Sequence, residues 1–134
     1  MSCYWDIEFS AIGPNDRTRE LERTVQALKF DDDHWKELSR PLILRNEPLL
    51  FHHVETYKLA SGFVAIHARR NYYGNEAMSE LIARFSDLTF QGVITTDTRE
   101  ESYTLFEGRE GEMTIEYCEY TYREGDPLLR GEST

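Results

Sequence analysis

Cysteine and positive charge are both scarce in this chain. Two cysteines, Cys3 and Cys118, occur in 134 residues, too few for a disulfide framework or a cysteine-rich metal site. Lys and Arg number 15 against 25 Asp and Glu, which gives a formal net charge of −10. Nucleic acids and anionic membranes bind proteins through Lys and Arg that displace counterions. The balance therefore argues against direct nucleic-acid or membrane binding and favours a basic protein partner.

Long hydrophobic runs are also missing. No apolar stretch approaches the roughly 18 residues that a membrane span needs. The first residues lack the basic and apolar regions of a secretory signal. We therefore expect a cytoplasmic protein whose thiols are reduced and structural.

Recognisable catalytic and cofactor motifs are absent too. The sequence has no G-x-S-x-G elbow, no phosphate-cradling glycine loop, no dinucleotide fingerprint and no H-E-x-x-H. Neither cysteine lies next to a feature that would lower the pKa of its thiol. We expect no catalytic residue and no cofactor, and we favour a binding protein over an enzyme.

The periodicity of the apolar residues predicts one α+β domain over residues 1–126. Residues 4–11 alternate as a half-buried strand, and Leu21, Val25 and Leu28 recur at helical spacing. A hairpin is expected over residues 49–69, a second helix around residues 78–85 and a three-stranded meander over residues 88–123. Breakers follow in residues 127–134, which we expect to form a flexible tail.

This order of elements resembles a ferredoxin-like sandwich, with two main helices packed on one antiparallel sheet of about five to seven strands. Within it, the segments 63–69, 79–90 and 105–108 are similar to the ferredoxin-like domain of phage-associated Api92-like proteins, over roughly residues 60–111. The resemblance implies the fold and a mobile-element context. It implies no chemistry for any residue.

Histidines on the predicted hairpin offer one candidate site. His67 falls roughly opposite His52 or His53, and imidazoles on adjacent strands can share a zinc ion. Two ligands of uncertain facing do not define a metal site, so we expect a polar sheet surface and no metal. The alternative function is a small-molecule or enzymatic pocket between sheet and helices, and its expected lining is His53, Tyr57, His67 and Arg69.

Acidic side chains are concentrated between residues 97 and 126, where ten acids accompany three bases. Regularly placed carboxylates attract a cationic groove, and tyrosines anchor protein contacts. We therefore expect a protein-binding module that acts stoichiometrically on a basic partner, as an inhibitor of a nucleic-acid-processing enzyme. Its biological form would be an anti-phage-defence inhibitor or a toxin-immunity protein. The expected contact residues are Glu100, Glu101, Glu110, Glu112, Glu116, Glu119, Tyr120 and Tyr122.

Alternation along the last predicted strand divides its side chains between two faces. Glu116, Tyr120 and Tyr122 share the face expected to dock the partner. Met113, Ile115 and Tyr117 share the other face, which we expect to lie in the core. Homodimerisation through the sheet is compatible with either function.

Overall fold

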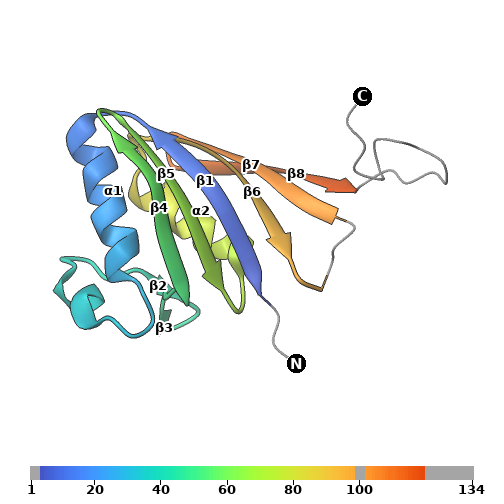
Figure 1. The fold of residues 1–134 in the computed structure, drawn as a ribbon, viewed down its shortest axis with the longest axis horizontal. Coiled ribbons are helices and arrows are strands. Elements are labelled where there is room, and N and C mark those ends of the chain that lie inside the picture. Colours follow the sequence, from blue (N-terminus) through green and yellow to red (C-terminus); the bar gives the residue numbers. More distant parts are fainter. Residues whose placement is uncertain (1–3, 99–101, 120–134) are drawn as a thin grey trace.

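The computed structural model describes residues 4–98 and 102–119 of the chain. The described part contains one large and one small sheet, two α-helices and a short 3-10 helix (Figure 1). The elements in chain order are β1 (Trp5–Ile12), α1 (Asn15–Ala27), η1 (Asp33–Glu37), β2 (Ile43–Leu44), β3 (Glu47–Pro48), β4 (His53–Ala60), β5 (Phe63–Arg70), α2 (Gly74–Arg84), β6 (Thr89–Thr96), β7 (Ser102–Arg109) and β8 (Glu112–Glu119).

The main sheet has six strands in the order β4-β5-β1-β6-β7-β8, and every neighbouring pair is antiparallel. The first strand of the chain is therefore central. Its residue Ile7 pairs with Ala68 of β5 on one side and with Ile94 of β6 on the other. Alternation predicted the inward face of β1 correctly, because Ile7, Phe9 and Ala11 are all buried.

Both α-helices pack on one face of this sheet. In Figure 1, α2 lies behind the strands. α1 packs against β4 and β5, whereas α2 contacts β1, β6, β7 and β8. Apolar stripes at helical spacing explain this packing: Leu21 and Val25 of α1 and Met78, Leu81 and Ile82 of α2 are fully buried. The core thus lies between the helices and the sheet, and the opposite face of the sheet carries no helix in the described part of the chain.

One glycine of the sheet lies where neighbouring atoms leave no room for a side chain. Gly92 of β6 lies opposite Phe9 of β1. A Cβ atom built at Gly92 would lie 2.4 Å from the carbonyl oxygen of Glu8 and 2.6 Å from the ring of Phe106. Glycine is therefore needed there for space.

The predicted ferredoxin-like sandwich is wrong. The prediction was one antiparallel sheet, but the eight strands of the described residues form two sheets. The second sheet is the β2–β3 pair, which lies with η1 in the connection between α1 and β4. The β7–β8 hairpin also extends the main sheet beyond β6. Ile115 and Tyr117 of β8 are 56% and 54% exposed, so the expectation that both lie in the core is wrong as well. Met113 alone of these three is partly buried against the core.

The separate elements were predicted more accurately than their assembly. The first strand, both helices, the 49–69 hairpin and the meander all appear within a few residues of their expected bounds. Residues 127–134, the expected tail, lie outside the described residues. Among the residues that the structure describes, no helix is long and apolar enough to cross a membrane.

Candidate functional site on the open face of the sheet

The helix-free side of the main sheet, here called the open face, carries a continuous row of side chains from all six strands. Register pairs Glu55 with His67, His67 with Glu8, Glu8 with Val93, Val93 with Leu105, and Leu105 with Glu116. We call these six residues the transverse row. Carboxylates stand at both ends and at the third position, and two apolar side chains lie side by side between Glu8 and Glu116.

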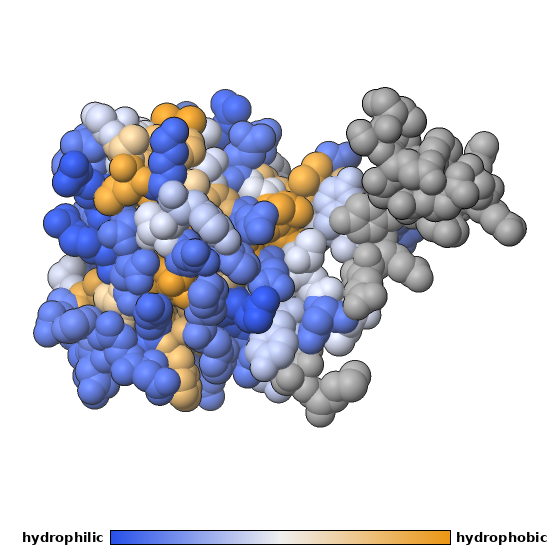
Figure 2. Space-filling view, in the orientation of Figure 1, coloured by the Kyte–Doolittle hydropathy of each residue, from blue (hydrophilic) through white to orange (hydrophobic). Residues whose placement is uncertain are grey.

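Two hollows flank the apolar part of the transverse row. The larger, of about 610 Å³, is lined by Tyr57 and Ala65 at one side and by Val93 and Leu105 at the other. The smaller, of about 220 Å³, lies over β6, β7 and β8 and is also bordered by Leu105. Figure 2, drawn from the same side as Figure 1, shows hydrophobic surface over the β6–β7 region set among hydrophilic side chains. Leu105 is 40% exposed, so it presents an apolar contact surface to solvent.

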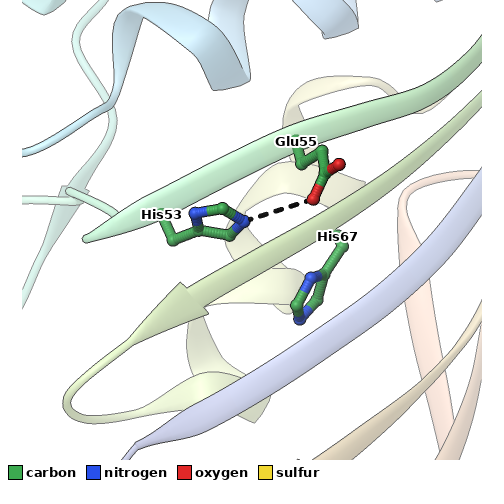
Figure 3. Close-up of side chains that lie close together, drawn as sticks. All are labelled: His53, Glu55 and His67. Carbon is green, nitrogen blue, oxygen red and sulfur yellow. Dashed lines mark ion pairs between the residues drawn. The ribbon is translucent and has the colours of Figure 1, made fainter.

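Three potential metal ligands meet at the other end of the row. His53 and Glu55 project from β4, and His67 projects from the neighbouring strand β5 with its ring on the side of β1 (Figure 3). Their ligand atoms all lie within 4.8 Å of one another. His53 Nε2 lies 3.5 Å from Glu55 Oε2, and the two imidazole centroids are 5.4 Å apart. We call these three residues the His–Glu cluster.

Asp6 of β1 holds the ring of His67 from the opposite side. Its Oδ1 atom lies 2.9 Å from His67 Nε2, and the same carboxylate accepts hydrogen bonds from Arg69 Nε and Nη2 at 2.9 Å and 3.5 Å. Burial raises the pKa of Asp6, but hydrogen bonds from Arg69 and His67 outweigh it and keep the pKa below its ordinary value. Asp6 is therefore an ionised acceptor at neutral pH, and His67 Nε2 is the donor.

A β-bulge brings Tyr57 to the same region. Thr56 pairs with Ile66 and Lys58 with Ala65, so Tyr57 between them has no opposite residue. A bulge of this kind re-aims side chains. The Tyr57 hydroxyl lies 3.5 Å from His67 Nδ1, and its ring stacks 6.2 Å from the imidazole. Partial desolvation, the charges of Glu55 and Glu8 and a hydrogen bond to Glu55 all raise the pKa of Tyr57, so the phenol is neutral at neutral pH.

The residues expected to line a small-molecule pocket do come together, but on the wrong side of the sheet for that prediction. His53, Tyr57 and His67 form one group, and Arg69 joins it through Asp6. The expected position between sheet and helices is incorrect. Thr56 is the side chain of this segment that faces a helix, since its hydroxyl contacts Gln26 and Glu22 of α1 at 3.1 Å and 3.3 Å.

The residues expected to bind a protein partner are divided by the fold. Glu116 lies on the open face, whereas Glu119 lies on the helix side of β8, because it pairs with the buried Ser102 and is an odd number of residues from Glu116. Glu110 belongs to the β7–β8 turn, and Glu112 begins β8 opposite Arg109. Glu100, Glu101, Tyr120 and Tyr122 lie outside the described residues. The members of this set that the structure describes therefore do not share one surface.

Sequence reasoning did not single out Asp6 and Glu8 as site residues. Their signal was present, since both occupy the polar face of the strand predicted over residues 4–11. Only the sheet order shows that this strand lies beside the one carrying His67. Comparisons of the chain with protein-family models, with curated proteins and with solved structures found no match.

Proposed function

We propose that this chain is a stoichiometric protein-binding module whose open face docks on a basic surface of another protein. The transverse row carries this proposal. It places the exposed Glu8 and Glu116 on either side of Val93 and Leu105, although Glu8 is far in sequence from the other three residues. Strand spacing of about 4.8 Å separates the two carboxylate positions by roughly 14 Å.

Burial and charge on the open face fit a protein interface. Stable interfaces combine an apolar centre with a polar rim that excludes water. Leu105 borders both hollows and supplies the centre, while Glu8, Glu107 and Glu116 supply the rim. A hollow beside an exposed leucine suits a side chain inserted by a partner.

The rim carboxylates are available to an external cation. Within residues 4–98 and 102–119, neither Glu8 nor Glu116 forms an ion pair with Lys or Arg, and Glu107 has only the exposed Arg109 at 3.6 Å. By contrast, Asp6 is already engaged by Arg69. The chain's net charge of −10 also steers a basic partner toward it during diffusional encounter.

The negative charge of the chain indicates which class of protein it would bind. Cationic grooves are typical of proteins that process nucleic acids, because such proteins must neutralise phosphates. We propose inhibition of such an enzyme, in the form of an anti-phage-defence inhibitor or a toxin-immunity protein. The mobile-element context comes from the resemblance to Api92-like domains alone.

Charge reversal on the open face tests the proposal. The wild-type chain would be used to capture a partner, which is then purified and measured alone against Glu8→Lys/Glu116→Lys. We expect the association rate constant to fall by more than about 10-fold for this variant, and for the wild type to fall steeply as salt rises. Because open-face contacts carry the binding, the matched reversal Glu80→Lys/Glu119→Lys on the helix side should retain most of it.

Two results would contradict the proposal. One is a helix-side variant that loses as much affinity as the open-face variant, since binding would then follow net charge alone. The other is an association rate that does not depend on salt. Leu105→Ala supplies a further readout, because loss of the apolar centre should raise the dissociation rate while leaving the association rate nearly unchanged.

A further inference from the structure

We propose that His53, Glu55 and His67 bind one divalent transition-metal ion of the zinc class on the open face. The three ligands differ from the docking residues Glu8, Leu105 and Glu116, although Glu8 lies opposite His67 and contributes its charge to both sites. It also revises the expectation from the sequence that no metal is bound. The convergence of His53 and His67 decides the point, because the sequence could not show which faces the two imidazoles occupy.

Distances in the His–Glu cluster suit a metal after small side-chain movements. Zinc bonds of about 2.0–2.2 Å place tetrahedral ligand atoms roughly 3.4 Å apart. His53 Nε2 and Glu55 Oε2 are already separated by 3.5 Å, and all ligand atoms lie within 4.8 Å. The side chains of His53 and Glu55 are 48% and 52% exposed, so both have room to rotate toward His67.

The hydrogen bonds of His67 prepare one of its nitrogens for metal binding. Histidine ligands usually donate their second ring N–H to a carboxylate, which fixes the tautomer and the orientation of the ring. Asp6 supplies that carboxylate at 2.9 Å from Nε2. The lone pair is consequently on Nδ1, the nitrogen that Tyr57 approaches at 3.5 Å. That contact is long, so a metal ion replaces it at little cost.

The charges around the cluster also favour a cation. Glu8 lies directly opposite His67 and lines a hollow of about 320 Å³ with Asp6 and Arg69. Arg69 lies opposite His53 and carries a permanent positive charge, with which Asp6 pairs. Glu55 and Glu8 therefore leave the surroundings of His67 negative.

The ligand types select the metal class. Two imidazoles and one carboxylate are a common zinc set, whereas calcium and magnesium favour oxygen ligands alone. The three ligands leave a fourth position open on the solvent side, which water would fill. Cobalt(II) occupies such sites with the same geometry and reports it through its visible absorption.

Calorimetric titration of the full chain, without a histidine tag, with Zn²⁺ tests this site. We expect one equivalent of Zn²⁺ to bind to the wild type. His53→Ala and Glu55→Gln should each weaken binding by at least about 100-fold, more than an outer-shell change costs. His52→Ala is the matched control, because His52 is adjacent in sequence but stacks on Phe30 with a centroid distance of 5.1 Å. It should leave the affinity unchanged.

Spectroscopy gives a second readout that does not rest on affinity. Cobalt(II) added to the wild type and to His52→Ala should give the strong visible bands of a four-coordinate site, and His53→Ala should lose them. Circular dichroism confirms that each variant is folded, and Glu55→Gln preserves side-chain size. The proposal is overturned if Zn²⁺ binding is not saturable, or if His52→Ala weakens it as much as His53→Ala does.

Discussion

Asp6 on β1 contacts His67 on β5 diagonally, not directly across the strand pair. The residue opposite Asp6 is Arg69, and the residue opposite His67 is Glu8, yet Asp6 Oδ1 lies 2.9 Å from His67 Nε2. One carboxylate thus joins two side chains of β5 that lie two residues apart. Asp6 therefore both fixes the orientation of His67 and neutralises the charge of Arg69.

Asp6→Asn removes both effects, and two different measurements report on them. The amide keeps the size of the side chain but removes the charge that Arg69 needs, so we expect the free energy of unfolding to fall by about 1–2 kcal/mol. Zn²⁺ affinity should fall by roughly 10–100-fold, the usual cost of changing an outer-shell partner. Urea denaturation and calorimetry measure the two quantities. An unchanged Zn²⁺ affinity would show that Asp6 does not orient His67 for metal.

Acid should remove the stability that Asp6 contributes. The pKa of Asp6 is lowered in the folded protein, so its contribution is present above the unfolded pKa of about 3.9 and is lost as pH falls through the lower folded value. The difference in unfolding free energy between wild type and Asp6→Asn should therefore shrink as pH falls below about 4. Urea titrations with chelator present measure it. A difference that grows as pH falls below about 4 would contradict this assignment.

Gly92→Ala should destabilise the sheet. The new Cβ would meet the backbone oxygen of Glu8 at 2.4 Å and the Phe106 ring at 2.6 Å, so β6 must move away from β1. Overpacking of this kind costs about 1–3 kcal/mol. Thermal unfolding measures the loss, and the control Thr89→Ala, at an exposed position of the same strand, should cost much less. Equal melting temperatures for wild type and Gly92→Ala would show that the strands are less closely packed.

Glu110→Asn should stabilise the β7–β8 hairpin. Glu110 and Gly111 form a two-residue turn with φ angles of 53° and 81°, and asparagine tolerates the left-handed region better than glutamate. We expect a gain of about 0.5–1 kcal/mol in unfolding free energy. Glu112→Asn makes the same change of charge at a position in β8 and should give no gain. If both variants are stabilised equally, the cause is reduced charge repulsion instead of turn geometry.

Local periodicity predicted the strands and helices best where the element buries a regular apolar stripe. The burial of Ile7, Phe9 and Ala11 on one side of β1 is an example. It could not predict which strands become neighbours, since pairing depends on contacts between distant residues. The β6–β7–β8 meander was predicted because its strands follow one another along the chain, whereas the position of β1 between β5 and β6 was not.

The candidate sites show the same limit. His53 and His67 could be named as neighbours on a hairpin, but the bulge at Tyr57 and the diagonal contact with Asp6 have no signature in the local sequence. The expected partner contacts were chosen from acids and tyrosines that are dense along the chain after residue 97, and alternation was expected to divide the last strand between two faces. Alternation in β8 places Glu116 and Glu119 on opposite sides, so density in sequence did not become density in space.

The central position of β1 has a consequence for the order of folding. Both of its neighbours are distant in sequence: even the nearest pair with β5 joins Ile12 to Phe63, and the corresponding pair with β6 joins Ile12 to Thr89. Contacts of such long range are slow to form, because a large loop must close before they contribute any stability. During translation, β1 leaves the ribosome before either neighbour has been made. Its apolar residues Ile7, Phe9 and Ala11 have no strand to pair with during that interval, so they are open to non-native contacts.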